Sequence, residues 1–154
     1  MKLPSCYLFQ SLSSSKIDRI ANITLEKQIQ KGEWIFHKGE AANRIYLVKE
    51  GAVELVIKVE EKIEIPICII RPENGCLGIG ALVEPYVYSL SARGFVDSIL
   101  LAINQKDLKN LMDNDPQLSQ IIMTNLAQKL LERLKQTRQE VKIHFMNLVR
   151  SATL

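Results

Sequence analysis

The chain has 154 residues, of which 47% are hydrophobic, and this is enough to build one domain around a packed core. Its 20 basic and 17 acidic residues leave a formal net charge of +3, which is too small to indicate nucleic-acid binding by the whole chain. No apolar segment approaches the roughly 18 residues that span a bilayer, and the N-terminal segment lacks the apolar run of a signal peptide, so we expect neither membrane insertion nor export.

The first segment, to about residue 31, is expected to be mostly helical. The serines at 13–15 can cap a helix, and Ile17, Ile20 and Ile23 follow at helical spacing.

From Lys31 to Ile103 the pattern changes to short runs rich in valine and isoleucine, separated by glycine, proline or charged turns. The predicted strands are residues 34–37, 45–48, 52–59, 63–71, 87–92 and 95–103. Several short strands at near-regular spacing predict a mainly β fold, either an antiparallel barrel or a jelly roll. Pro66 removes a backbone donor, so its strand is expected to lie at an edge or to be broken there.

Helical periodicity returns after Ile103. Asn104 begins a short predicted helix that runs through Met112, and Asp115 with Pro116 is a typical start of a second helix. This second helix is expected to continue to about Arg150, and it carries a stripe of residues at 3–4 spacing: Ala127, Leu130, Leu134, Thr137, Val141, His144 and Leu148. A stripe of this length predicts a homodimer seam along the helix.

The pattern of glycines and aromatic residues between Lys31 and Leu55 is more specific. It places Gly32-Glu33, Phe36, Gly39-Glu40, Tyr46 and Gly51 at fixed separations. This run resembles the start of the cyclic nucleotide-binding domain of the catabolite activator protein and fumarate-nitrate regulator superfamily. The resemblance implies an antiparallel β-roll of the jelly-roll type (a double-stranded β-helix) with N-terminal helices over residues 1–115, and a long dimerisation helix over 116–154.

The family also implies a phosphate-binding cassette, in which a glutamate binds the ribose of a cyclic nucleotide and an arginine neutralises its phosphate. Leu77-Gly78 matches the opening of the cassette, and Ala81-Leu82-Val83 matches its apolar part. Gly78 and Gly80 would allow the backbone to approach an anion closely. Ile79 stands in the place of the glutamate, and Tyr88, followed by Ser89, stands in the place of the arginine. The resemblance makes one further residue a candidate for ligand contact, Thr137 of the long helix, where the family often has a threonine that faces the base across the dimer.

The two departures from the family pattern weaken the expected binding of a cyclic nucleotide. Isoleucine cannot accept a hydrogen bond, and tyrosine supplies one neutral donor instead of a cation. A lost hydrogen bond to a charged group costs about 1.5 to 3 kcal/mol, and a buried phosphate that is not neutralised costs more. Together the two departures predict binding at least ~100-fold weaker than usual. Arg93 offers a replacement cation only if it reaches into the site, although a shift of five residues along a strand changes the face.

Other classes of site fit the sequence less well. The two histidines, His37 and His144, are far apart in the sequence, which argues against a cupin metal centre. A role for either histidine as a haem ligand would rest on analogy between folds alone. Three cysteines fit neither a disulfide framework nor a zinc pattern, and an iron–sulfur cluster needs about four ligands, so a reduced, cytoplasmic setting is expected. Cys68 and Cys76 are predicted to be core residues. No catalytic motif or metal site is present in the sequence, and we expect no enzyme.

The resemblance implies a sensor or effector domain of a bacterial transcription regulator that does not bind cAMP in the ordinary way. Its ligand would be a cyclic nucleotide (cAMP or cGMP) or another small effector, and the alternative is a ligand-free dimerisation or interaction module. The family reads DNA through a winged helix-turn-helix that would follow Leu154, so we expect no DNA contact from this chain alone.

Overall fold

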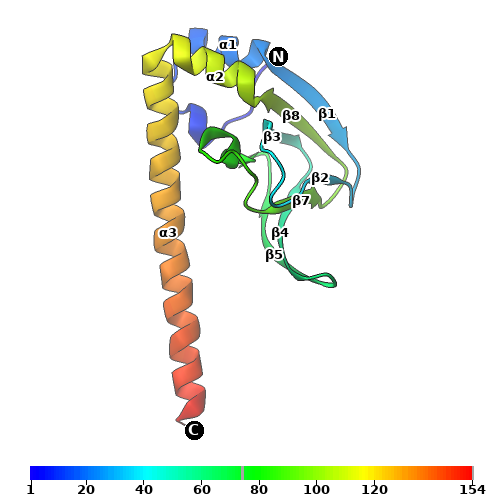
Figure 1. The fold of residues 1–154 in the computed structure, drawn as a ribbon, viewed down its shortest axis with the longest axis vertical. Helices are drawn as coiled ribbons and strands as arrows, with labels where there is room; N and C mark the ends of the chain where they lie inside the picture. The colour runs from blue at the N-terminus through cyan, green and yellow to red at the C-terminus, as the bar shows by residue number, and fades with distance from the viewer. Residues whose placement is uncertain (74, 154) are drawn as a thin grey trace.

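The computed structural model describes residues 1–73 and 75–153, and in this part of the chain two four-stranded antiparallel sheets form a β-roll (Figure 1). The first sheet has the order β1 (Thr24–Ile29), β8 (Ser98–Asn104), β3 (Arg44–Glu50) and β6 (Cys76–Leu77). The second has the order β2 (Trp34–Phe36), β7 (Ser91–Gly94), β4 (Val53–Glu60) and β5 (Ile63–Ile70). The predicted mainly β roll is therefore confirmed.

The core of the roll lies where strands present branched side chains inward. In the first sheet Ile45 and Leu47 of β3 pair with Ile103 and Leu101 of β8, and all four residues are fully buried. Their burial removes a large apolar area from water, which is the main favourable term in folding. This sheet supports the segment between β6 and β7, which carries the predicted cassette.

The prediction of helix up to residue 31 is wrong for its last part. The helix α1 spans Ser14–Asn22, and Ser13 caps it by accepting a hydrogen bond from the Lys16 amide at 3.4 Å. The following residues form the strand β1, which pairs with β8 from Thr24 to Ile29. Pairing with an already apolar strand overrides the local helix preference of the charged residues in β1.

Two other strands begin three or four residues later than predicted. Residues 87–90 are a loop with a single bridge between Val87 and Ala41, and β7 begins at Ser91, whereas β8 begins at Ser98 and not at residue 95. The expectation for Pro66 is confirmed, because β5 is the edge strand of its sheet.

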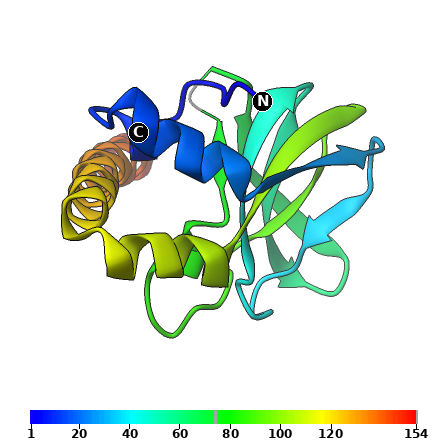
Figure 2. The same ribbon diagram turned by 90° about the horizontal axis from the view of Figure 1, so that it is seen from above.

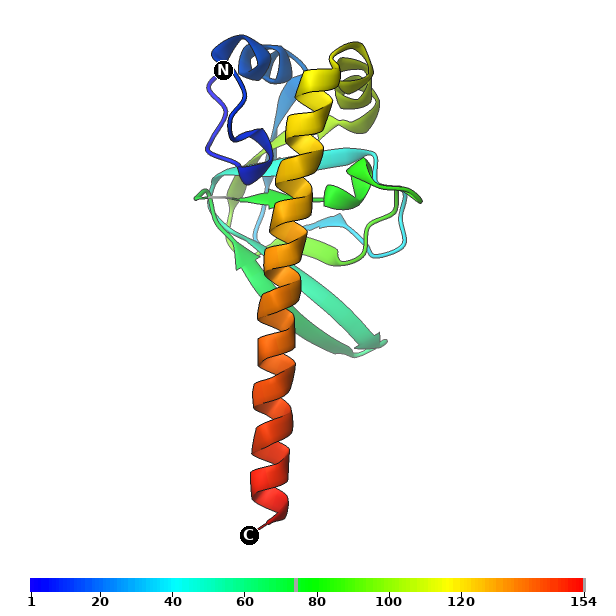
Figure 3. The same ribbon diagram turned by 90° about the vertical axis from the view of Figure 1, so that its left-hand side faces the viewer.

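The C-terminal helices agree with the sequence. The helix α2 spans Gln105–Asn114 and is capped by Asn104, and α3 spans Pro116–Ala152 and is capped by Asp115. Viewed from above, α1 and α2 lie at the end of the roll next to the start of α3 (Figure 2). Leu118, Ile122 and Leu126 of α3 are buried, whereas the rest of the helix runs along the roll and projects past it (Figure 3).

The 3-10 helices η1 (Tyr7–Phe9) and η2 (Ile79–Leu82) complete the described elements. The first packs against α3, and the second follows β6 directly. Within the described residues no helix combines the length and the apolar character that a membrane crossing requires.

Candidate ligand-binding site

The predicted cassette begins at the end of β6 and folds tightly against the roll. Gly78 has a φ of +83°, and a Cβ there would lie 2.8 Å from the Arg44 carbonyl oxygen and 3.1 Å from Cε1 of Tyr88. A Cβ on Gly80 would collide with the carbonyl group of Val87. Both glycines are therefore required by packing within the chain, because only glycine avoids these contacts.

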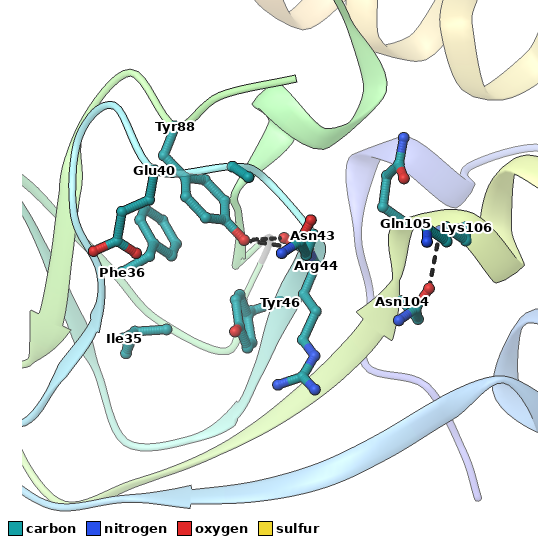
Figure 4. A pocket seen from close by; sticks show the side chains of 11 residues that line it. Ile35, Phe36, Glu40, Asn43, Arg44, Tyr46, Tyr88, Asn104, Gln105 and Lys106 are labelled. Atoms are coloured by element: carbon teal, nitrogen blue, oxygen red, sulfur yellow. Dashed lines mark hydrogen bonds between the residues drawn. The ribbon is translucent and has the colours of Figure 1, made fainter. Parts of the chain in front are cut away.

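Tyr88 fills the centre of the site. Its ring stacks on that of Phe36, with centroids 3.8 Å apart and planes 11° apart. Its hydroxyl donates a hydrogen bond to the Arg44 carbonyl oxygen at 2.8 Å and accepts one from the Arg44 amide at 3.2 Å (Figure 4). Burial raises the pKa of Tyr88 to about 12, so the phenol is neutral at pH 7. The side chain predicted to stand at the position of the family's arginine is thus an uncharged part of the core.

The space left inside the cassette is small, with a cavity volume of about 70 Å³. Five of the predicted site residues line it together: Gly78, Ile79, Gly80, Tyr88 and Ser89. Ala81 and Leu82 lie beside a second cavity of about 160 Å³, which they share with residues of α2 and not with the cassette. Thr137 is exposed and lines neither cavity, so contact between Thr137 and a ligand stays a prediction for the dimer.

Arg133 of α3 also lines the cassette cavity, although no sequence motif singles it out. Its side chain is partly buried, its guanidinium carbon lies 5.8 Å from the centre of the Tyr7 ring, and it makes no ion pair with any described residue. The neighbouring Cys6 thiol and burial raise the pKa of Cys76 well above its usual value, and the Arg133 charge acts in the opposite direction. A cation therefore faces the cavity from the helix and not from the roll.

Arg93 does not supply that cation. Its Nε lies 3.0 Å from a carboxylate oxygen of Glu54, and its Nη1 lies 2.5 Å from one of Glu64. The guanidinium also covers the ring of Trp34 at 5.1 Å. These partners hold Arg93 on the β4–β5 side of the sheet, and Arg93 is not among the residues that line the cassette cavity.

A larger groove of about 480 Å³ lies on the other side of Tyr88 (Figure 4). Phe36 and Tyr88 line both spaces, so the stacked pair separates the groove from the cassette cavity. The rim of the groove carries Glu40, Arg44 and Lys106, which make no ion pair with described residues.

The cysteines and histidines are not grouped as metal ligands within the described part of the chain. Cys76 is buried as predicted. The prediction for Cys68 is wrong, because Cys68 is exposed on β5, an edge strand that pairs with only one neighbouring strand, β4. His37 lies 4.8 Å from the Trp34 ring, and His144 is exposed on α3. Among residues 1–73 and 75–153, no three His, Cys, Asp or Glu side chains are grouped as metal ligands.

Comparison with known proteins gives a consistent result. Residues 26–115 match the family model of the cyclic nucleotide-binding domain. A structure from Geobacter metallireducens GS-15, named as a cyclic nucleotide-binding protein, is 31% identical with a TM-score of 0.71, and the match covers 82% of this chain and 91% of that one. The catabolite activator protein of Thermus thermophilus is 26% identical with a TM-score of 0.74, and the match covers 89% of this chain and 62% of that one.

Two curated relatives are longer than the region of similarity. A protein of Rhodopseudomonas palustris, named as a potassium channel protein, is 28% identical over 75% of this chain, which spans 27% of the relative. The global nitrogen regulator of Synechococcus elongatus is 25% identical over 81% of this chain, which spans 54% of the relative. The domain thus occurs in relatives that have different names and additional sequence. Similarity over this region alone does not establish the function of the whole proteins.

Proposed function

This chain belongs to the cyclic nucleotide-binding domain family and resembles regulators of the catabolite activator type, and on that premise we propose that it is the sensor domain of a bacterial transcription regulator. In this proposal the domain does not bind cAMP or cGMP in the ordinary way. The family consists of regulatory domains, so the domain acts by binding and transmitting, and not by catalysis. We place its work in the cytoplasm, as for other transcription regulators.

The observation that carries the proposed lack of ordinary cAMP and cGMP binding is the occupation of the cassette by Tyr88. Sites for small molecules and cofactors usually have volumes of about 300 to 1,000 Å³. The cassette cavity has about 70 Å³, because the Tyr88 ring and the Ile79 side chain take up the space. A cyclic nucleotide would need Tyr88 to leave both its stacking on Phe36 and its two hydrogen bonds to Arg44.

The route for a signal in this proposal is α3. The helix supplies Arg133 to the cassette cavity and exposes a large apolar surface beyond Leu126, including Leu130, Leu134, Val141, Leu148 and other large side chains. Apolar surface of this extent on a projecting helix favours burial against a second copy. We propose a homodimer through α3, in which a ligand shifts the balance between two arrangements of the helix pair. Contact with DNA is proposed only for a longer protein in which a helix-turn-helix domain follows α3.

The alternative function is an interaction module without a ligand, in which α3 alone does the work. The small cavity favours this alternative, because the cassette is almost filled by its own side chains.

Titration of the purified chain with cAMP and cGMP tests the proposal. We expect no saturable heat at micromolar nucleotide in isothermal titration calorimetry. Saturable binding of either nucleotide in that range would overturn the claim that Ile79 and Tyr88 disable the ordinary site.

A further inference from the structure

We propose that the cassette cavity is a site for a short-chain carboxylate, held by the guanidinium of Arg133 from α3. This inference rests on the proposed sensor function and names the chemical class of its ligand. It differs from the family pattern, in which the cation that meets the ligand lies on the roll beside the cassette.

Arg133 carries a charge that has no carboxylate partner among the described residues. Its side chain is partly buried among η1, β6 and the cassette, yet no described carboxylate lies within ion-pair distance. A guanidinium that is shielded from water gains more from an anionic partner than an exposed one does. Every other arginine named in the site region is either engaged, as Arg93 is, or exposed, as Arg44 is.

The walls of the cavity combine one cation with apolar side chains. Next to Arg133 the cavity is lined by the apolar side chains of Leu55, Ile79 and Leu90, and the hydroxyl-bearing Ser89 lies at its edge. The planar fork of a guanidinium matches the two oxygens of a carboxylate. A ligand that meets both surfaces has a carboxylate at one end and a short alkyl group at the other.

The volume of the cavity suits a small anion. A cavity of about 70 Å³ has room for about two water molecules, since each occupies ~30 Å³ in the liquid. Acetate and propionate are of this size, whereas a nucleotide is several times larger. With so few atoms in contact, the dissociation constant is expected between about 0.1 and 10 mM.

A donor without a hydrogen-bond partner among the described residues lies near Arg133, although its residue, Tyr7, does not line the cavity. The Tyr7 hydroxyl is buried and finds no hydrogen-bond partner among the described residues. Burial raises the pKa of Tyr7, so its proton stays on the oxygen, and the Arg133 guanidinium carbon lies 5.8 Å from its ring centre. A carboxylate bound to Arg133 brings acceptor oxygens to this neighbourhood.

The position of Arg133 on α3 gives the site a role in signalling. A ligand that binds both the cassette and this arginine connects the roll to the helix that we propose as the dimer seam. Occupancy therefore favours the helix arrangement in which Arg133 reaches the cavity.

The test uses the full 154-residue chain and follows backbone amide shifts by NMR during titration with sodium acetate and sodium propionate. Sodium chloride at the same ionic strength corrects for screening. We expect saturable shifts at Gly78, Ile79, Gly80 and Ser89, and at least ~10-fold weaker binding in Arg133→Gln. Arg138→Gln is the matched control, because it removes the same charge from an exposed position on the same helix.

Three results would overturn the carboxylate site: no saturable shifts in the wild type, equal binding by Arg133→Gln, or equal binding of nitrate or phosphate. None of these results bears on the proposed loss of ordinary cyclic-nucleotide binding, which fails separately if cAMP or cGMP binds at micromolar concentration. Thermal melting of both variants checks that the fold is intact.

Discussion

The ring of Tyr88 stacks on that of Phe36 with a distance of 3.8 Å between the ring centres. The Tyr88 hydroxyl donates a hydrogen bond to the Arg44 carbonyl oxygen and accepts one from the Arg44 amide. Stacking and two hydrogen bonds fix this side chain, which the sequence motif predicts to stand at the position of the family's arginine. The same residue therefore removes a charge from the site and fills its volume. Substitutions at Tyr88 are expected to change both ligand binding and stability.

Restoring the two family side chains should restore nucleotide binding. In Ile79→Glu/Tyr88→Arg, the glutamate provides an acceptor for a ribose hydroxyl and the arginine provides a cation for the phosphate, while the cavity loses the Tyr88 ring. Each contact to a charged group is worth about 1.5 to 3 kcal/mol, so we expect at least ~100-fold tighter binding of cAMP than in the wild type. Competition with a fluorescent cAMP analogue measures the change.

The single variant Tyr88→Arg is the control for this experiment and should fall between the wild type and the double variant. Because an arginine in a buried position can unfold the domain, circular dichroism must show native strand content first. Equal cAMP affinity of the wild type and the folded double variant would contradict the assignment of Ile79 and Tyr88.

Removing only the Tyr88 hydroxyl tests how strongly it holds the cassette. Tyr88→Phe keeps the stacking on Phe36 but loses both hydrogen bonds to Arg44, so the free energy of unfolding should fall by about 1 to 2 kcal/mol at pH 7. Urea denaturation measures this difference.

The difference in the free energy of unfolding between the wild type and Tyr88→Phe should change at high pH. Burial raises the pKa of Tyr88 to about 12 in the folded chain, above the value of about 10 in the unfolded chain. The contribution of the neutral Tyr88 phenol to the free energy of unfolding is therefore complete below pH 10 and is lost as the pH rises toward 12. The wild type should lose stability relative to Tyr88→Phe over this range, and a constant difference from pH 8 to 11.5 would contradict the role of the buried phenol.

The sequence predicted the fold around this site better than the contacts that its residues make. The glycines from Gly32 to Gly51 mark turns whose spacing depends on local chain geometry, and this spacing alone indicates the family and the roll. The positions of Ile79 and Tyr88 followed from the same alignment of motifs, and the fold brings both into one cavity. What the motif could not predict is that Gly78 and Gly80 serve packing against Arg44 and Val87, whose backbones approach them only in the folded chain.

The failures have a common cause in contacts between segments that are far apart in sequence. The strand β1 looks helical on its own and becomes a strand by pairing with β8, about 75 residues later. Arg133 is one of several basic residues in the sequence of α3, and only the packing of α3 beside the cassette places it at the cavity. Periodicity records which face of an element is apolar, but it does not record which element that face meets.

The proposed dimer predicts a difference between two faces of α3. Leu134 lies on the predicted seam and is 45% exposed in the single chain, whereas Ile143 is 49% exposed and lies nine residues later, on the opposite face of a helix with 3.6 residues per turn. Leu134→Asp places a charge in the seam and should give monomers in sedimentation velocity. Ile143→Asp should remain dimeric, and a monomeric wild type would show that the seam is wrong.

The carboxylate of Asp115 joins α1 to the start of α3, and this gives a prediction for acid pH. One oxygen accepts a hydrogen bond from the Leu118 amide at 3.1 Å, and the other lies 2.6 Å from both Lys16 Nζ and Arg19 Nη2. Lys16 and Arg19 hold the pKa of Asp115 well below its usual range of about 3.9. Asp115→Asn keeps a good capping side chain but loses the charge, so we expect a lower melting temperature at pH 7.

The sign of the pH effect follows from the depressed pKa. The stabilisation by the Asp115 charge is fully present above the unfolded pKa of about 3.9, and it is lost as the pH falls toward the folded pKa. The melting temperatures of the wild type and Asp115→Asn should therefore converge between about pH 5 and pH 2. Asp113→Asn is the matched control, because Asp113 is exposed and makes no ion pair with described residues, so its substitution should leave the melting temperature nearly unchanged. A gap between the wild type and Asp115→Asn that stays constant from pH 7 to pH 2 would show that the two cations do not stabilise this junction through the Asp115 charge.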